Sequence, residues 1–175
     1  IASLSIPLQE QLKSTNMEFY QKGKYLYLLG GYGYSATLGD HTTFSNLTAI
    51  DVPGTIDAVI NNANLESYSR QITDPQFQVT GGRLEKINNT FYLVGGQKFL
   101  GRYNPMGPNH GPGFVQTYTD QIRKFNLIDD GKTITVMEAE RVDTTWTHGA
   151  GCTSSAAITA GLAHGKSVEE AVEEE

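Results

Sequence analysis

The sequence contains very little cysteine and tryptophan, and it lacks an excess of basic charge. Its single cysteine, Cys152, excludes an internal disulfide framework and a cysteine-cluster metal site. The 13 basic and 19 acidic residues give a net charge of −6, which argues against a nucleic-acid partner. No stretch approaches the roughly 18 apolar residues of a membrane span, so we expect no membrane-spanning segment.

The beginning of the sequence lacks features of a leader. It opens at Ile1 without methionine or a charged n-region, so we expect a processed or excised piece that has lost any targeting segment. One cysteine does not fix a compartment, and the localisation stays unknown.

The composition favours β-structure and changes along the chain. Nineteen glycines and nine tyrosines, with few charges, are typical of strands joined by many turns. All nine tyrosines, seven phenylalanines and six prolines precede residue 137, whereas the remainder is rich in alanine, serine and glutamate. We therefore predict a β-rich part over residues 1–136 and a short α-helical tail over residues 137–175.

The first part contains an internal repeat. Residues 25–31 (YLYLLGG) resemble residues 91–96 (FYLVGG), and the pairs Thr15/Thr80 and Leu12/Phe77 keep an offset of 65 residues. Each copy reads as a strand, a tight turn, a second strand and Gly-Gly, which is the signal of a β-hairpin.

A second match extends each copy to four strands. Residues 47–52 resemble residues 122–127 at an offset of 75. The ten extra residues fall in a loop over residues 102–113, where three prolines and three glycines oppose regular structure. Fourth strands are expected around residues 66–71 and 133–136, so the two units cover about residues 15–71 and 80–136.

A four-stranded antiparallel sheet repeated in tandem is typical of a propeller blade. The repeat resembles the Kelch family, whose blades carry Gly-Gly at the end of the second strand. We accordingly predict two Kelch-like blades; an ordinary β-sandwich with two similar hairpins is the alternative. The glycines Gly30, Gly31, Gly95 and Gly96 are expected to be structural, allowing positive φ and close backbone approach.

The loops that follow the Gly-Gly strands offer a candidate binding surface. His41, Arg102, Tyr103 and His110 lie in these loops, and loops on one face of a propeller form its binding surface. The alternative is that they are solvated loop residues. The four histidines of the chain are far apart in sequence, and we expect no metal site.

The tail carries a phosphate-binding pattern. The glycine-rich turn Gly149-Ala150-Gly151-Cys152 leads into an alanine-rich stretch that reads as a helix, with Gly165 as its C′ residue. Free backbone N–H groups and the positive end of the helix dipole favour an anion at such a turn. We predict an anion-binding site at these four residues.

Residues of about 135–172 resemble the carboxy-terminal signature of hydroxymethylpyrimidine phosphate kinases, ribokinase-like enzymes related to pyridoxal kinases. The resemblance implies that the backbone of Gly149, Ala150 and Gly151 stabilises the transferring phosphoryl group. It places Cys152 where the family has the residue that accepts the substrate hydroxyl proton. It also implies ATP and magnesium, and an α/β fold that the residues before 135 do not match.

Two functions follow from the two parts. The main hypothesis is a non-catalytic Kelch-like fragment without cofactors, in a chimeric or truncated chain, that binds a protein or small ligand through its loops. The alternative is an ATP- and magnesium-dependent phosphotransferase acting on a hydroxymethyl pyrimidine or pyridoxine-like alcohol, with Cys152 as catalytic residue. A third possibility is self-association through open sheet edges.

Overall fold

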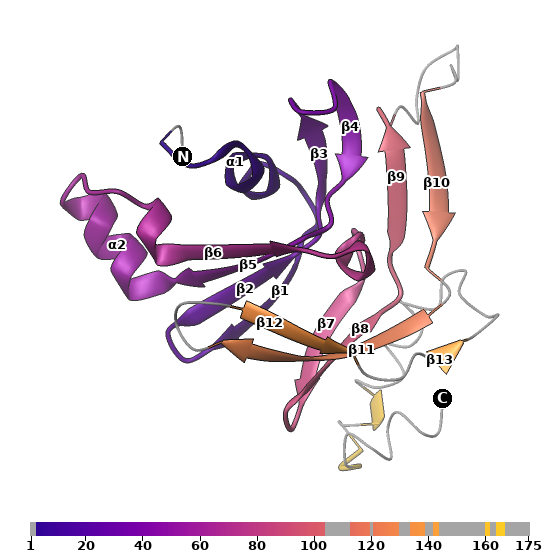
Figure 1. The fold of residues 1–175 in the computed structure, drawn as a ribbon. Helices are drawn as coiled ribbons and strands as arrows, with labels where there is room; N and C mark the ends of the chain where they lie inside the picture. The colour runs from indigo at the N-terminus through magenta and orange to yellow at the C-terminus, as the bar shows by residue number, and fades with distance from the viewer. Residues whose placement is uncertain are drawn as a thin grey trace.

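The computed structural model describes residues 3–103, 113–119, 121–129, 134–138, 142–143, 160–161 and 164–166. The described part is mainly β, with antiparallel sheets and few helices (Figure 1). This confirms the predicted β class.

Two four-stranded antiparallel units repeat along the chain (Figure 1). The first has the order β1-β2-β5-β6 and consists of β1 (Glu18–Lys22), β2 (Tyr25–Leu29), β5 (Asn46–Asp51) and β6 (Ser69–Thr73). The second has the order β12-β11-β8-β7 and consists of β7 (Arg83–Ile87), β8 (Thr90–Val94), β11 (Gln121–Asp129) and β12 (Ile134–Glu138), and β13 (Val142–Asp143) also pairs with β11. The predicted division at residue 136 stays a prediction.

The repeat is visible in the backbone of both hairpins. Each two-residue turn begins at positive φ, +57° at Gly23 and +53° at Asn88, which stand 65 residues apart. Thr15 bridges Tyr32, and Thr80 bridges Gln97 at the same offset. The spacing of turn and glycine signals therefore located the first two strands of each sheet correctly.

A third sheet occupies the segments that the sequence suggested were loops. It has the order β10-β9-β4-β3, built from β3 (Tyr32–Ser35), β4 (Asp40–Thr43), β9 (Gln97–Gly101) and β10 (Phe114–Tyr118). The prediction that His41 lies in a loop is wrong, because His41 lies within β4. The sheet joins the two repeats, since Thr42 of β4 pairs with Leu100 of β9, a long-range contact that local turn signals do not report.

The first repeat carries two short helices, α1 (Ile6–Leu12) and α2 (Val52–Ile60), and the 3₁₀ turns are η1 (Glu66–Tyr68) and η2 (Pro75–Phe77). The Asp51 carboxylate caps α2 by accepting a hydrogen bond from the Gly54 amide at 3.2 Å, and Pro53 lies in its first turn. No helix of the described ranges is both long and apolar enough to cross a membrane.

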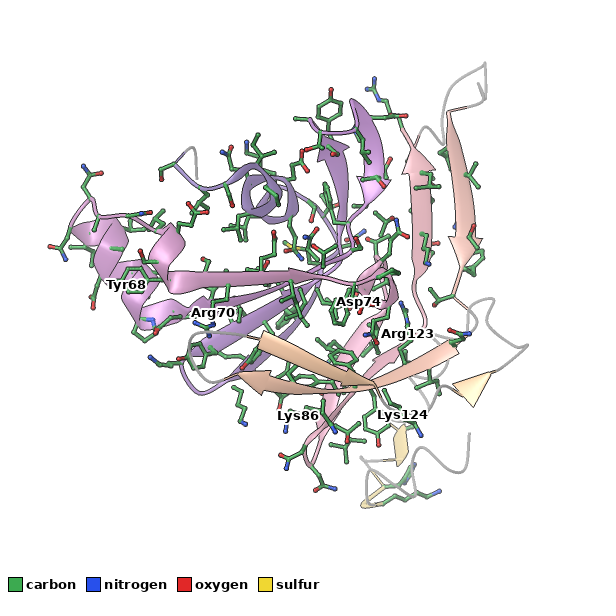
Figure 2. All side chains as sticks on the ribbon, viewed as in Figure 1. Tyr68, Arg70, Asp74, Lys86, Arg123 and Lys124 are labelled. Carbon is green, nitrogen blue, oxygen red and sulfur yellow. The ribbon has the colours of Figure 1, made fainter. Side chains whose placement is uncertain are left out.

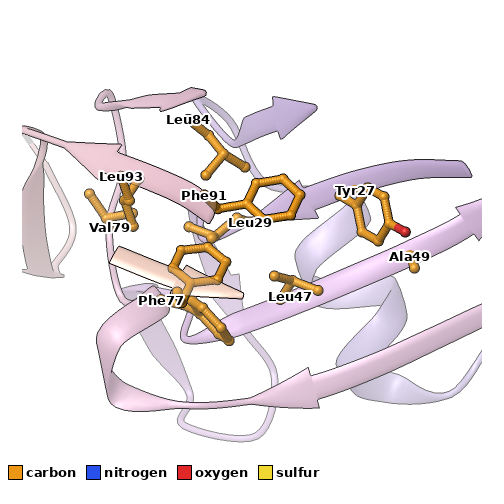
Figure 3. Packing of buried hydrophobic residues seen from close by; sticks show 10 residues of the cluster. Tyr27, Leu29, Leu47, Ala49, Phe77, Val79, Leu84, Phe91 and Leu93 are labelled. Carbon is orange, nitrogen blue, oxygen red and sulfur yellow. The ribbon is translucent and has the colours of Figure 1, made fainter. Parts of the chain in front are cut away.

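The main core lies between the two repeated sheets (Figure 3). Phe77 lies 5.2 Å from Phe125 between ring centroids, and Phe91 stacks on Phe125 at 5.5 Å. Apolar residues of both repeats therefore exclude water together. The buried cluster comprises Tyr27, Leu29, Leu47, Ala49, Phe77, Val79, Leu84, Phe91, Leu93 and Phe125.

The prediction of a Kelch propeller is wrong. Within the described residues the sheets close into neither a propeller nor a barrel (Figure 1), whereas closed propellers typically have 4–8 blades. The Gly-Gly pattern misled because it reports a local need for positive φ at the end of a hairpin, and that need does not specify how sheets are arranged around an axis.

Candidate functional site

The four glycines that end β2 and β8 adopt left-handed backbone. Their φ angles are +67° at Gly30, +97° at Gly31, +63° at Gly95 and +84° at Gly96. A Cβ on Gly30 would lie 2.1 Å from the Val79 carbonyl oxygen. Gly30, Gly31 and Gly96 are therefore packed tightly against neighbouring chain segments.

An aromatic cluster brings two of the predicted surface residues into one neighbourhood. The Tyr32 ring lies 5.9 Å from the His41 ring and 5.4 Å from Phe99, and Phe99 lies 5.3 Å from Tyr103. The Tyr32 hydroxyl donates to the Gly101 carbonyl at 2.7 Å and accepts from the Tyr103 amide at 2.8 Å. His41 and Tyr103 therefore share Tyr32 as a neighbour.

Of the other predicted surface residues, Arg102 is exposed, and His110 lies outside the described residues. Tyr34 extends the aromatic surface, since its ring meets the His41 ring edge-on at 5.4 Å and is 56% exposed. The role of this surface in binding stays a prediction.

The predicted anion cradle, Gly149 to Cys152, lies outside the described residues. The structure does describe the turn downstream of it, where Gly165 has a φ of +81°. The Lys166 amide donates to the Gly161 carbonyl at 3.1 Å, and the His164 amide donates to the Ala160 carbonyl at 3.0 Å. This 6→1 bond across a left-handed glycine is the Schellman pattern of a helix C-terminus.

A polar cleft of about 280 Å³ lies where the two repeats meet β10. Gln76 and Arg123 contribute to its wall and are 7% and 5% exposed. Arg123 donates to the Gln76 carbonyl at 2.6 Å and to the Gly95 carbonyl at 3.3 Å, and Figure 2 places it near the segment that begins at Asp74. The lining residues are Pro75, Gln76, Lys98, Thr117, Tyr118, Thr119, Gln121 and Arg123.

Two polar groups of the lining residues lack a partner among the residues that the structure describes. The Gln76 side-chain nitrogen is buried out of reach of solvent and has no hydrogen-bond partner there. The Lys98 ammonium forms no ion pair within the described part of the chain. An unpaired buried amide is unusual, because its desolvation is not compensated.

Glu18 is a buried carboxyl group close to this cleft. It accepts a hydrogen bond from the Gly82 amide at 2.6 Å and is 7% exposed. Burial raises the pKa of Glu18 to about 7, although the Gly82 amide and the nearby Arg83 and Arg123 charges act to lower it. Glu18 therefore changes charge near neutral pH.

The sequence interpretation missed Gln76, Arg123 and Glu18. For Gln76 and Arg123, the sequence repeat itself contained a signal. Gln76 stands 65 residues after Gln11, and Arg123 stands 75 residues after Thr48, so an arginine occupies the place of a buried threonine. A cation at the buried position of a repeat is a reason to search for a site there.

The described residues do not fit a magnesium site. Among them, no group of three or more His, Cys, Asp and Glu side chains could hold a metal ion. Magnesium prefers oxygen ligands such as carboxylates.

Comparisons with known proteins match the end of the chain. Residues 113–175 match the family model of phosphomethylpyrimidine kinase. The chain is 55% identical over 47 residues, 27% of its length, to the pyridoxine kinase of Bacillus subtilis (strain 168). It is 56% identical over 43 residues, 25% of its length, to a Treponema pallidum (strain Nichols) protein named "Putative pyridoxine kinase".

The coverage of these relatives is small. The matched stretches span 17% of the Bacillus protein and 16% of the Treponema protein, so the chain covers about a sixth of each. The finding supports a pyridoxine or phosphomethylpyrimidine kinase-like region. Like the arrangement of the sheets, it also contradicts the Kelch interpretation, because the relatives found are kinases and none of these matches supports a Kelch repeat.

Proposed function

We propose that residues 113–175 provide the phosphate-binding element of an ATP-dependent kinase whose substrate is a pyridoxine-like or hydroxymethyl pyrimidine alcohol. The observation that carries this proposal is the match of this stretch to the phosphomethylpyrimidine kinase family, together with the 55–56% identity of 43 to 47 residues of the chain to pyridoxine kinases. The alternative hypothesis from the sequence is thus better supported than the non-catalytic one.

The proposed reaction transfers the γ-phosphoryl group of ATP to the substrate hydroxymethyl oxygen. The new P–O bond forms at that oxygen, the bond to the departing ADP breaks, and Cys152 accepts the hydroxyl proton as a thiolate. The backbone amides of Gly149, Ala150 and Gly151 donate to the phosphoryl oxygens. Magnesium would supply charge neutralisation when bound. These roles come from the family resemblance.

The experiment is a phosphorylation assay on the complete chain, with radiolabelled ATP, magnesium and either pyridoxine or hydroxymethylpyrimidine. We expect phosphorylated alcohol, and we expect Cys152→Ala to lower its rate of formation by about 10²- to 10⁴-fold, the usual contribution of general acid–base catalysis. His164→Ala, which removes an exposed side chain from the same region, is the matched control and should leave the rate unchanged.

Two results would count against the kinase. One is the absence of phosphorylated alcohol above a protein-free control. The other is equal loss of rate in Cys152→Ala and His164→Ala, which would indicate a general effect of substitution in this region. Product identity, established by mass spectrometry, separates alcohol phosphorylation from simple ATP hydrolysis.

A second candidate is ligand binding without catalysis at the aromatic surface around His41 and Tyr103. The shared contacts with Tyr32 favour it, because they hold exposed rings in fixed positions. Loss of binding in Tyr34→Ala, with unchanged unfolding, would support this role for any ligand found. Self-association through β10, which is an edge strand among the described strands of its sheet, remains a proposal, tested by sedimentation over a range of protein concentrations.

A further inference from the structure

Strand β10 is the outermost strand of the third sheet (Figure 1). It pairs with β9 on one side, and no other strand of the described ranges pairs with it. Val115 in β10 is 62% exposed, and Gln116 and Thr117 are also exposed. An edge strand of this kind presents backbone groups to which another strand can bind.

Other edge strands of the molecule are protected against such pairing. At the opposite edge of the same sheet, Tyr32 in β3 exchanges both backbone hydrogen bonds with Thr15, at 2.8 and 2.9 Å. Three edge strands of the repeats contain charged residues, which oppose the addition of a further strand. In contrast, β10 has the sequence FVQTY, with no charge and no proline. The charged edge residues are Glu18 and Lys22 in β1, Arg70 in β6, and Arg83, Glu85 and Lys86 in β7.

The backbone of Gln116 faces away from β9. Gln116 stands opposite Phe99 in the β9–β10 pair. The Phe99 amide donates to the Thr43 hydroxyl at 2.8 Å, and the Phe99 carbonyl accepts from the same hydroxyl at 3.2 Å, so both groups point toward β4. Opposite residues of an antiparallel pair either exchange both backbone bonds or direct both groups outward. The N–H and C=O groups of Gln116 therefore point to the outer edge of the sheet.

The strand is self-complementary about Gln116. Because backbone direction alternates along a strand, Phe114 and Tyr118 share the orientation of Gln116, one on each side of it. If two copies of β10 pair antiparallel with Gln116 opposite Gln116, each Phe114 stands opposite Tyr118 of the second copy. Aromatic pairs across strands stabilise antiparallel sheets. Val115 stands opposite Thr117 in this register, so no charged residue of β10 meets a like charge.

We infer that two copies of the chain associate through β10, paired antiparallel with Gln116 at the two-fold axis, so that their third sheets become continuous. Association stops at two copies, because both use the same edge. A five-residue edge is small beside interfaces of about 1,200–2,000 Å², so we expect a reversible dimer with a Kd of about 10⁻⁵ to 10⁻⁴ M. The inference specifies the self-association proposed above, and it does not depend on the kinase because it uses no residue assigned to phosphoryl transfer.

The first test is sedimentation of the complete chain at protein concentrations from about 10⁻⁶ to about 10⁻³ M, which bracket the expected Kd. We expect monomer at the lowest concentrations and dimer at the highest, with no larger species. Amide hydrogen exchange then locates the contact without a substitution. The Gln116 amide should exchange more slowly as the protein concentration rises, whereas the Thr117 amide, which faces β9, should exchange at a rate independent of concentration.

A pair of opposite substitutions tests the register. Gln116→Lys and Gln116→Glu each place like charges across the two-fold axis, so each variant alone should dimerise about tenfold more weakly. An equimolar mixture of the two should restore dimerisation, because opposite charges then face each other. Gln21→Lys makes the same change at an exposed residue of β1 and should alter the Kd less than about twofold.

Urea unfolding of each variant checks that it is folded, since the Gln116 side chain also donates to the Gln97 side-chain oxygen at 2.5 Å. If a variant does not fold, the exchange rates of the Gln116 and Thr117 amides in the unsubstituted chain still decide the question.

Three results would overturn the inference. A chain that stays monomeric over the whole concentration range would leave the edge of β10 to a strand of another protein. A dimer whose Kd is unchanged in the folded Gln116 variants, or not restored in their mixture, would show that the copies associate through another surface or register. Exchange of the Gln116 amide that does not depend on protein concentration would also contradict pairing at this edge.

Discussion

The two repeated sheets share a backbone plan but differ in the polar residues they enclose. Both have a hairpin whose turn starts at positive φ and a Gly-Gly pair in left-handed conformation. Gln11 in the first repeat is hydrogen-bonded through its side-chain nitrogen and oxygen, whereas the side-chain nitrogen of Gln76, at the same position in the second repeat, has no partner among the described residues. The two copies therefore share their backbone conformation and differ in the hydrogen bonding of their buried side chains.

The same comparison bears on stability. A satisfied polar network rigidifies a core, while a buried polar group without a partner costs stability. The first repeat thus encloses a satisfied network, and the second encloses a buried amide nitrogen without a partner among the described residues. The kinase-like match begins at residue 113, so it includes strands of the second repeat and none of the first.

The largest expected effect concerns the shared skeleton. Gly30→Ala places a Cβ 2.1 Å from the Val79 carbonyl oxygen at a φ of +67°, so backbone must move. We expect the free energy of unfolding to fall by about 4 kcal/mol. Gly23→Ala is the matched control, because its φ is +57° and nothing lies within 4 Å of the added Cβ.

Chemical denaturation measures both variants. Gly23→Ala should lose about 1 kcal/mol, the usual penalty for a side chain in left-handed backbone. Equal losses of unfolding free energy in the two variants would show that only the φ angle matters. The close approach of Gly30 to Val79 would then make no contribution to stability, contrary to the prediction.

Sequence patterns located this skeleton because it depends on local signals. Turn residues at Gly23 and Asn88, followed by alternating apolar residues and Gly-Gly, were enough to predict two four-stranded antiparallel sheets. The third sheet was missed, because β4 and β9 pair across 58 positions from Thr42 to Leu100. The Kelch assignment failed for a related reason, since local glycine requirements do not determine how sheets assemble.

The candidate site was less accessible to prediction than the fold. His41 and Tyr103 were chosen from loop position, yet their common neighbour Tyr32 comes from a strand that the sequence did not reveal. Gln76 and Arg123 carry no local sequence signal that distinguishes them from other polar residues, because their burial depends on long-range packing. The kinase-like motif was recognisable from sequence alone, because its signal is a contiguous stretch.

A substitution of medium effect compares the two glutamines directly. Gln11→Met breaks the bonds to Asn46, Gly30 and Thr48 and leaves buried polar groups unpaired, so we expect a loss of about 3 kcal/mol. Gln76→Met makes the same change of side chain but removes an amide nitrogen that has no partner within the described ranges of the chain.

The matched variant should therefore lose less than about 1 kcal/mol, since no satisfied hydrogen bond of that nitrogen is removed. Urea unfolding of the two proteins gives the comparison. If Gln76→Met is as destabilising as Gln11→Met, the second network is closed like the first, and the distinction between the repeats disappears.

The smallest effect concerns Glu18, whose repeat equivalent is the exposed Arg83. Burial raises the pKa of Glu18 from 4.5 in the unfolded chain to about 7 in the folded one. The folded state thus holds this proton more tightly, so its stabilising contribution is complete below pH 4.5 and is lost as the pH rises through 7.

Between pH 5 and pH 8, this group should lower the free energy of unfolding by about 2 kcal/mol. Glu18→Gln keeps an oxygen acceptor for the Gly82 amide but does not titrate, so the variant should lose that part of the pH dependence. Urea unfolding at both pH values measures the difference. Identical pH profiles for the two proteins would mean that Glu18 is ionised throughout, with the charges of Arg83 and Arg123 outweighing its burial.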